Sequence, residues 1–410
     1  MLNKMFFGLL LFSAFLLADE RSELLVKKKL NQTFEESKVP VTVTTPEMIA
    51  VAKKRVAAKA QPWYASYELI KKHASETLNK PIEIYTKTQP GHKSEDAVHP
   101  VCSRSFCAAR DCAFVWLMEG NKEYLDYSKK ILIEWARTKP EPIINLESRR
   151  DYPYWDADLG LLGGVPFVFY AHAYTLVYPE LTAEEIQDIR LWLTKVGFRL
   201  KYWHLAWTAN DYYGNQYYNN HLSWHNAAIG AIGFALQDNR FAAFAVDSGE
   251  NPRDFKEMLA GAILMPGDDT HDAHKDTIAA GEIYDRYRSH EHKGLGYAMY
   301  HGMALTYLAE MAYNNGVDLF SYTAPGGENL FLLYSYYAEF IEKDDASLKN
   351  GLYKGDSVPT HYTHVYDWIN AHYPGHEEIE AVIKTHNRGL ENKGEHHAAT
   401  IGLTHIKSLD

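Results

Sequence analysis

The sequence is poor in cysteine, with three among 410 residues. All three lie in one short stretch, at Cys102, Cys107 and Cys112, and the two five-residue spacings match no common zinc-binding pattern. The surrounding segment, 105–118, has the pattern of an apolar helix. The favoured interpretation is therefore buried thiols on a core helix, and a local disulfide of Cys102 is the alternative.

Positive charge is also scarce, because 42 Lys and Arg stand against 53 Asp and Glu, giving a net charge of −11. Proteins that bind nucleic acid generally need a basic surface to displace counterions from phosphates. The composition therefore argues against a nucleic-acid partner.

Disorder is excluded as well, since a chain of this length with 46% hydrophobic residues can bury a large core.

No hydrophobic run after residue 17 is long enough to cross a membrane. Lys4 puts a positive charge near the amino terminus. An apolar run from Met5 to Leu17 follows, and then the small residue Ala18. This is the pattern of a secretory signal peptide, and the run is shorter than the roughly 20 residues of a membrane-spanning helix. We predict a signal peptide at 1–18, a single mature domain at 19–410 without membrane contact or lipid anchor, and a periplasmic or secreted location.

Aromatic residues are abundant and of a particular kind: 29 Tyr exceed 17 Phe, beside 9 Trp. Rings that carry a polar group are typical of wet clefts and sugar-binding surfaces.

Sequence patterns typical of β-strands are rare. Thr45 and Pro46 form a helix start, with Thr as the cap. Amphipathic or fully apolar segments follow at 105–119, 122–137, 158–178, 182–204, 220–236, 253–264, 291–315, 328–342, 362–372 and 377–389.

These segments predict an all-α protein. Several of them are apolar on most sides, which is expected of helices that are packed between two layers. Consecutive helices without a linker or a composition break suggest helical hairpins arranged in a ring, and no internal repeat supports a solenoid.

The sharpest local motif is Asn219-Asn220-His221, followed by Trp224 and His225. It leads directly into a helix of small residues, 226–235. Two amides and an imidazole at the start of a buried helix put hydrogen-bond donors beside the positive end of the helix dipole, which suits a carboxylate ligand. The alternative is structural, because asparagine often caps a helix and a lone histidine is often a core residue.

A second motif gathers positive charge in this acidic chain. The segment 282–293 contains the cations Arg286, Arg288, His290 and Lys293. Tyr297 and Tyr300 follow on the next helix and share one face because they are three residues apart. An acidic protein that binds an anionic chain must concentrate positive charge locally, and we expect Arg286, Arg288 and Lys293 to do so. A solvated charge run before a core helix is the alternative.

Together, these segments resemble the alginate lyase family of polysaccharide lyases, the group with an (α/α) toroid that includes families five and thirty-eight. The resemblance is carried by Asn219-Asn220-His221-x-x-Trp224 and by Leu295-x-Tyr297-x-x-Tyr300. Weaker support comes from Ala108-Ala-Arg110-Asp-x-Ala113-Phe, Glu134-Trp135 and Leu159-Gly-Leu-Leu. The resemblance covers residues 45–310. It implies an (α/α) toroid and an enzyme that cleaves a polyuronate by β-elimination.

The resemblance also implies roles for individual residues. Asn220 and His221 are the family's positions for neutralising the uronate carboxylate, and Tyr297 falls on its catalytic acid/base. A tyrosine with its ordinary pKa of about 10 needs cations nearby to act as a phenolate. The family has an arginine about two turns before this tyrosine, where this chain has His290, with Arg288 two residues earlier. Either Arg288 reaches the same place or His290 has taken over part of the role.

The stereochemistry of the reaction points to a substrate class. In β-D-mannuronate and β-D-glucuronate the C5 proton and the C4 oxygen leave from the same face, so that one tyrosine can serve both. In α-L-guluronate they leave from opposite faces, which requires a second group such as His221. The resemblance therefore implies a mannuronate- or glucuronate-type polymer as the partner.

Further residues are expected at the substrate or near it. The residues predicted to contact the substrate are Tyr154, Trp155, Trp224, His225, His290, Lys293 and Tyr300. The loop 87–93 could be a lid over the cleft. The run Asp268-Asp-Thr-His271-Asp-Ala-His274 has possible metal ligands, but it matches no defined site and a solvated acidic turn is favoured. We therefore predict no metal and no cofactor.

Two other functions remain open from the sequence alone. The first is an inverting glycoside hydrolase on a similar helical toroid, with two carboxylates as acid and base. The carboxylates available for it are Asp156, Asp158, Glu282 and Asp285. The second is an exported glycan-binding protein without catalytic activity, which would use the same aromatic and basic residues.

Overall fold

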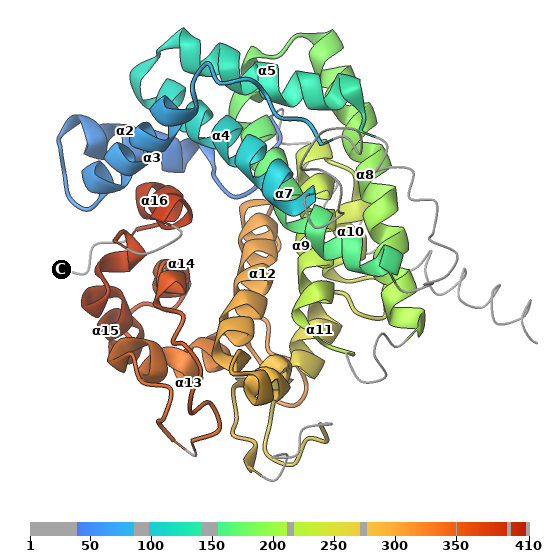
Figure 1. Ribbon diagram of the computed structural model, residues 1–410, viewed down its shortest axis with the longest axis vertical. Coiled ribbons are helices and arrows are strands. Elements are labelled where there is room, and N and C mark those ends of the chain that lie inside the picture. The colour runs from blue at the N-terminus through green and yellow to red at the C-terminus, as the bar shows by residue number, and fades with distance from the viewer. Residues whose placement is uncertain are drawn as a thin grey trace, which may run out of the picture.

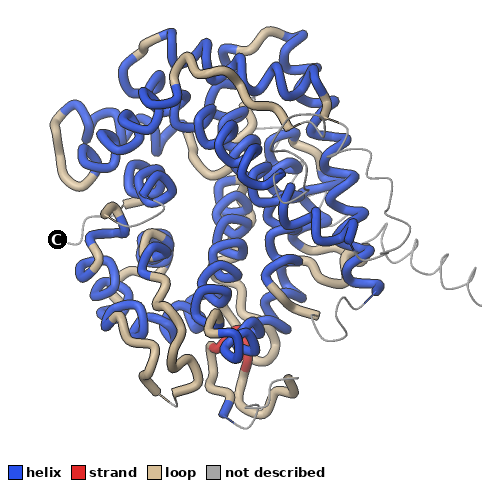
Figure 2. The backbone as a smooth tube through the Cα atoms, viewed as in Figure 1, coloured by secondary structure: helices blue, strands red, loops and turns tan. Residues whose placement is uncertain are grey.

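The protein is built almost entirely from helices. The computed structural model describes residues 39–85, 98–140, 155–210, 217–270, 277–349, 351–391 and 395–406. Within these ranges the strands are β1 (Ile263–Leu264) and β2 (Glu282–Ile283), which pair antiparallel with Ile263 opposite Ile283. Figure 2 shows this small ribbon at one end of a helical body.

The described ranges contain fourteen α-helices. The α-helices are α2 (Pro46–Ala57), α3 (Trp63–Thr77), α4 (Val98–Glu119), α5 (Lys122–Thr138), α7 (Trp155–Val177), α8 (Ala183–Asn210), α9 (Asn220–Leu236), α10 (Asn239–Val246), α11 (Phe255–Ala262), α12 (Gly294–Asn314), α13 (Leu330–Lys343), α14 (Val365–His372), α15 (Glu377–Thr385) and α16 (Glu395–Thr404). Short 3₁₀ helices are η2 (Tyr178–Glu180), η5 (Tyr284–Glu291), η6 (Thr360–Tyr362) and η7 (Asn387–Gly389).

The helices form a ring (Figure 1). Going round it, α4 packs on α7, α7 on α9, and α9 on α12. From α12 the ring continues through α14 and α16 to α3, which packs on α4 again. A second set lies outside: α5 covers α4, α8 covers α7 and α9, and α10 covers α9. This arrangement confirms the predicted all-α toroid.

Inner helices α9 and α12 are buried on most sides because most of their residues are apolar or small. In α9, all of which is described, every residue except His221 is buried. Glycine permits this packing: a Cβ at Gly233 would lie 2.2 Å from the backbone nitrogen of Ala242 in α10. The close contact of α9 with α10 therefore requires glycine at that position.

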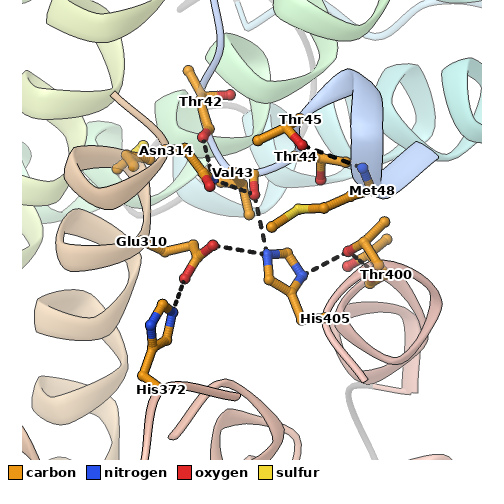
Figure 3. Close-up of polar contacts among 12 residues, drawn as sticks. Thr42, Val43, Thr44, Thr45, Met48, Glu310, Asn314, His372, Thr400 and His405 are labelled. Atoms are coloured by element: carbon orange, nitrogen blue, oxygen red, sulfur yellow. Dashed lines mark hydrogen bonds and ion pairs between the residues drawn. The ribbon is translucent and has the colours of Figure 1, made fainter. Parts of the chain in front are cut away.

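The ring is closed by a polar cluster between the start and the end of the described chain (Figure 3). Glu310 of α12 forms ion pairs with His372 of α14, at 2.7 Å, and with His405 after α16, at 3.2 Å. The backbone oxygen of Val43 lies 3.1 Å from His405 Nε2 and accepts from Asn314 Nδ2 at 2.9 Å. The cluster thus ties the segment before α2 to three helices of the ring.

The structure confirms most of the local expectations and adds elements. Each predicted helical segment overlaps an observed helix, and Thr45 caps α2 by accepting a hydrogen bond from Met48 N at 3.2 Å. Helices α3, α10 and α16 were not predicted. All three cysteines lie on α4 as free thiols, two of them buried. None of the helices in the described ranges combines the length and the apolarity needed to span a membrane.

Candidate active site

The amino-terminal end of α9 presents two polar side chains from an otherwise buried helix. Asn219 has extended backbone angles and caps the helix, its side-chain oxygen accepting from His221 N at 3.2 Å. Asn220 is the first helical residue and is 1% exposed. His221 is half-buried. The cap therefore fixes the amide and the imidazole at the positive end of the helix dipole, as the sequence predicted.

The His221 ring is held by a stacking contact. Trp207 of α8 lies with its ring centroid 4.5 Å from that of His221, and the planes are 30° apart. One turn further along α9, His225 is fully buried against His204. Burial and the neighbouring histidines lower the pKa of His225 well below its ordinary value, and burial lowers that of His204 to about 4. Both rings behind His221 are therefore neutral at pH 7.

The second part of the site is the junction of η5 and α12. The chain leaves η5 at His292, whose φ of 57° is left-handed, and enters α12 at Gly294. This turn brings η5 back against α12. The result is that the guanidinium carbon of Arg288 lies 4.3 Å from the ring centroid of Tyr297. Tyr297 is half-buried on a helix whose next turns are almost fully buried.

Arg288 keeps its charge in this position. Burial opposes the charge, but the hydrogen bond to Glu291 at 2.9 Å and the neighbouring Tyr297 raise the pKa of Arg288 above its ordinary value. The Nε atom of Arg288 is buried without a hydrogen-bond partner in the described part of the chain. A cation is thus fixed on the face of Tyr297, with donor capacity left over.

A hydrogen bond joins the two parts of the site. Asn220 Nδ2 donates to Asp285 Oδ1 at 3.0 Å, and both side chains are buried. Asp285 belongs to η5, three residues before Arg288, and a 3₁₀ helix has three residues per turn, so both residues lie on one face. One face of η5 therefore contacts Asn220 of α9 and Tyr297 of α12, although these residues are far apart in the sequence.

Tyr300 forms the boundary between the site and a cavity. A cavity of about 730 Å³ has Tyr300, Tyr362, Asp111, Cys107 and His397 in its wall. Four histidines line it in all, among other residues. Burial raises the pKa of Tyr300 well above its ordinary value, so its hydroxyl stays protonated at neutral pH. Tyr300 is therefore unsuited to act as a phenolate.

The structure corrects two of the predicted substrate contacts. Trp224 and His225 are both 0% exposed. The Trp224 ring centroid lies 5.0 Å from that of Tyr300 and 6.0 Å from that of Tyr307, within the core. Trp224 packs behind Tyr300 in the core and His225 fills the space below His221, so neither side chain is at the surface of the site.

The predicted cations also divide into different groups. Arg286 is fully buried and forms an ion pair with Glu282, so it does not serve to capture an anionic substrate, contrary to the expectation. His290 and Lys293 have exposed side chains that lie beside Glu291, at 3.6 and 3.4 Å. Of the two alternatives left open by the sequence, the structure puts Arg288 and not His290 against Tyr297.

Some predicted residues lie outside the described part of the chain. Tyr154, the loop 87–93 and His271 to His274 belong to this group. Trp155 begins α7, but its side chain is not described. Within the described ranges no group of three or more His, Cys, Asp or Glu residues is arranged to hold a metal ion.

Sequence reasoning missed three residues of the site. Trp207 orients His221, and Asp285 and His301 form a hydrogen-bonded chain with Asn220. Asp285 was considered only as a carboxylate for a hydrolase. The three-residue spacing of Asp285 and Arg288 places both on one face of a 3₁₀ helix. It could have indicated that Asp285 belongs to the site, but only if the segment was known to be such a helix.

The chain is similar to known proteins in sequence. Residues 50–347 match the sequence profile of the family described as Alginate lyase. A protein of Stenotrophomonas maltophilia (strain K279a) named Alginate lyase is 22% identical over 256 residues, which is 60% of this chain. The match spans 31% of that relative's own length.

Solved structures show the fold. An alginate lyase from Bacteroides ovatus is similar with a TM-score of 0.63 and 12% identity, covering 91% of this chain and all of that one. Alginate lyase A1-III from Sphingomonas species A1 is similar with a TM-score of 0.57 and 13% identity, covering 90% of this chain and 98% of its own. A Tyr-to-Phe variant of A1-III, complexed with tetrasaccharide, has a TM-score of 0.56 at 13% identity and covers 85% of this chain and 94% of its own.

Proposed function

Since the chain belongs to the alginate lyase family, we propose that it is a polysaccharide lyase that cleaves a polyuronate by β-elimination. The observation that carries the proposal is Arg288 at 4.3 Å from the Tyr297 ring, with the same short helix hydrogen-bonded to Asn220. β-Elimination from a uronate requires a base and a group that neutralises the carboxylate next to the acidic proton. Tyr297 supplies the first, and Asn220 with His221 the second.

The reaction starts with proton transfer from C5 of the uronate to the deprotonated hydroxyl oxygen of Tyr297, whose ring lies beside the positive charge of Arg288. The electrons of the C5–H bond form the C4=C5 double bond, and the C4–O bond breaks. The leaving oxygen then takes the proton from Tyr297. Negative charge builds up on the carboxylate during the first step, and hydrogen bonds from Asn220 and His221 stabilise it in the same way as an oxyanion hole.

The substrate follows from the use of one tyrosine for both proton transfers. This requires that the C5 proton and the C4 oxygen leave from the same face, as in polymannuronate and glucuronan. A guluronate polymer would need His221 as a second proton-transfer group. Two complexes of alginate lyase A1-III with tetrasaccharide are of a Tyr-to-Phe and a His-to-Ala variant. The proposal likewise gives catalytic roles to a tyrosine, Tyr297, and a histidine, His221.

The hydrolase alternative loses support for two of its four carboxylates, while Asp156 and Asp158 lie in a part of α7 whose side chains are not described. Glu282 and Asp285 are both 0% exposed, Glu282 in its ion pair with Arg286, and Asp285 in its hydrogen bonds. An inverting hydrolase needs a carboxylate that reaches the attacking water and another that reaches the leaving oxygen. Neither of these two residues has that access.

The proposal is tested by the product. Purified protein is incubated with polymannuronate, glucuronan and polyguluronate, and ultraviolet absorbance and reducing ends are measured together. A lyase gives both signals, because each cut leaves a conjugated, unsaturated uronate, and we expect the first two polymers to be cleaved. Reducing ends without absorbance on these polymers would support the hydrolase, and binding without either signal would support a glycan-binding protein.

A matched pair of variants tests Tyr297. Tyr297→Phe removes the hydroxyl and is expected to abolish turnover while oligosaccharide binding is kept. Tyr313→Phe makes the same change near the other end of α12, where the side chain is 46% exposed, and is expected to leave turnover unchanged. Turnover of Tyr297→Phe at the rate of the unchanged protein would remove this residue from the mechanism.

We also propose that the protein acts outside the cytoplasm. The support is the signal-peptide pattern of residues 1–18. Expression of the full chain followed by amino-terminal sequencing of the mature protein tests this, with Asp19 expected as the first residue. Recovery of the intact chain from the cytoplasm alone would contradict it.

A further inference from the structure

Three buried polar side chains from three elements form one hydrogen-bonded chain behind the proposed site. Asn220 of α9 donates to Asp285 Oδ1 of η5 at 3.0 Å. The other oxygen of Asp285 lies 2.7 Å from His301 Nδ1 of α12. Asn220 is 1% exposed, and Asp285 and His301 are 0% exposed. Because each member is buried, a lost hydrogen-bond partner is costly, and such a chain has few alternative arrangements.

The carboxylate determines which way the Asn220 amide points. An amide has a donor end and an acceptor end of similar shape, and in isolation either end could face a neighbour. An ionised carboxylate accepts hydrogen bonds and cannot donate them, so Asn220 must turn its nitrogen toward Asp285. The second N–H of that nitrogen and the Oδ1 atom are then left for another group. Oδ1 is buried without a hydrogen-bond partner in the described chain.

His301 in turn determines how the carboxylate is oriented. Because Asp285 accepts only, His301 must carry a proton on Nδ1. With Asn220 on one oxygen and His301 on the other, the carboxylate cannot rotate without losing a buried hydrogen bond. The orientation is thus passed from the fully buried His301 within α12 to Asn220 at the start of α9.

The position of this negative charge is otherwise unfavourable. A buried carboxylate beside Asn220 repels a uronate carboxylate that approaches the same amide, and its burial alone is costly. Asp285 therefore does not help to attract the substrate. Its benefit must lie in the geometry that it imposes.

We propose that Asp285 is a positioning residue, which together with His301 holds the Asn220 amide with its free N–H toward the carboxylate of the substrate. This inference rests on the proposed lyase function. It assigns Asp285 no contact with the substrate. Its whole effect on the reaction passes through Asn220.

A double-mutant cycle tests this dependence. Asp285→Asn has the same shape but can turn either end toward Asn220, so the amide loses its defined orientation. We expect kcat to fall by 10-fold or more and KM to change by less than 3-fold, since charge develops on the carboxylate mainly in the transition state. In an Asn220→Ala background, the same change should have no further effect, because the residue through which it acts is missing.

Two controls separate positioning from folding. Asp367→Asn alters another buried carboxylate, which pairs with Arg388 in a different part of the ring, and should lower Tm without lowering kcat. At His301, an asparagine can place its Nδ2 where the imidazole has Nδ1. We therefore expect His301→Asn to restore most of the kcat that His301→Ala loses.

The inference is overturned if Asp285→Asn has the kcat of the unchanged protein, or if it lowers kcat equally in both backgrounds. Absence of any turnover by the unchanged protein is a different result, which contradicts the proposed lyase function instead. In that case, the same four proteins are compared by calorimetric binding of a mannuronate tetrasaccharide. A loss of affinity from Asp285→Asn that vanishes in the Asn220→Ala background supports positioning, and equal losses in both backgrounds overturn it.

Discussion

The guanidinium carbon of Arg288 lies 4.3 Å from the centroid of the Tyr297 ring. The contact depends on the turn between η5 and α12, where His292 has a left-handed φ of 57°. Glu291 binds the same guanidinium at 2.9 Å and limits its movement. The contact is therefore a fixed feature of the junction, and its contribution to turnover can be measured.

Removing the charge of Arg288 should slow the reaction. Arg288→Gln removes the positive charge beside the Tyr297 ring, and with it an interaction that stabilises the negative charge of the transition state. We expect kcat to fall by about 100-fold, and Arg288→Lys, which keeps the charge but not the planar contact, to lose about 10-fold. Initial rates of unsaturated product measure both effects.

Arg55 provides the matched control. Its guanidinium carbon lies 4.8 Å from the Trp63 ring, a similar stacking contact at the other side of the ring of helices. Arg55→Gln should leave kcat within about 2-fold, because Arg55 stacks on Trp63 and not on Tyr297. An Arg288→Gln protein with the kcat of the unchanged protein would show that Tyr297 does not depend on this cation.

The stacking of Trp207 on His221 leads to a second prediction. Trp207→Leu removes the partner ring, and aromatic pairs of this kind contribute about 0.5–1.5 kcal/mol. We expect kcat to fall by about 10-fold because the imidazole loses its fixed orientation. Steady-state kinetics combined with thermal unfolding measure the effect on activity and on stability.

Trp203 is one turn earlier on α8, and like Trp207 it is 1% exposed. Trp203→Leu creates a similar loss of buried volume without touching His221. Both variants should lower Tm by similar amounts, and only Trp207→Leu should lower kcat. Equal kcat losses in the two would mean that the effect comes from general destabilisation.

The positions of α9 and α12 could be predicted from the sequence, because most of their residues are apolar or small. Asn219 marks the start of α9: its type and its place before the helix predicted the cap that the structure has. Such apolarity has a drawback, however. It leaves no pattern to indicate which residues of α9 face the site, so His221 and the buried His225 look alike in the sequence.

The cations of η5 could not be assigned for a different reason. Arg286 and Arg288 are two residues apart in a 3₁₀ helix, so they point in different directions, one into the core and one toward Tyr297. A period of three cannot be distinguished from one of 3.6 over eight residues. Asp285 and Asn220 are 65 positions apart, so no local sequence pattern predicts the hydrogen bond between them.

The three cysteines permit a test of the interior of α4. Burial raises the pKa of the Cys107 thiol to about 11 and that of Cys112 to about 12, and it also raises that of Cys102. The thiolate is the reactive form, so all three should react slowly with a thiol reagent at pH 8 in the folded protein. In denaturant without reductant, three thiols per chain should be counted. A count of one would indicate a disulfide.

The Glu310 cluster should make the fold sensitive to acid. Glu310 is 1% exposed; burial opposes its charge, but His405 and His372 outweigh this and lower its pKa from 4.5 to about 2. A carboxyl group with a lowered pKa in the folded state stabilises the fold above its unfolded pKa, and this contribution is lost as the pH falls toward 2. At about 1.4 kcal/mol per pKa unit, the contribution is on the order of 3 kcal/mol at pH 7.

Glu310→Gln should therefore lower the free energy of unfolding by about 3 kcal/mol at pH 7, and leave a buried pair of histidines without their anion. The decisive measurement is Tm against pH. Between pH 5 and pH 3 the unchanged protein should lose more stability than the variant, so that the two curves converge. Glu339→Gln, which removes an exposed pair with Lys343, should differ by less than about 0.5 kcal/mol at every pH. Parallel curves for Glu310→Gln and the unchanged protein would show that the acid sensitivity arises elsewhere, since a carboxylate held by His372 and His405 cannot be removed without losing its share of the pH dependence.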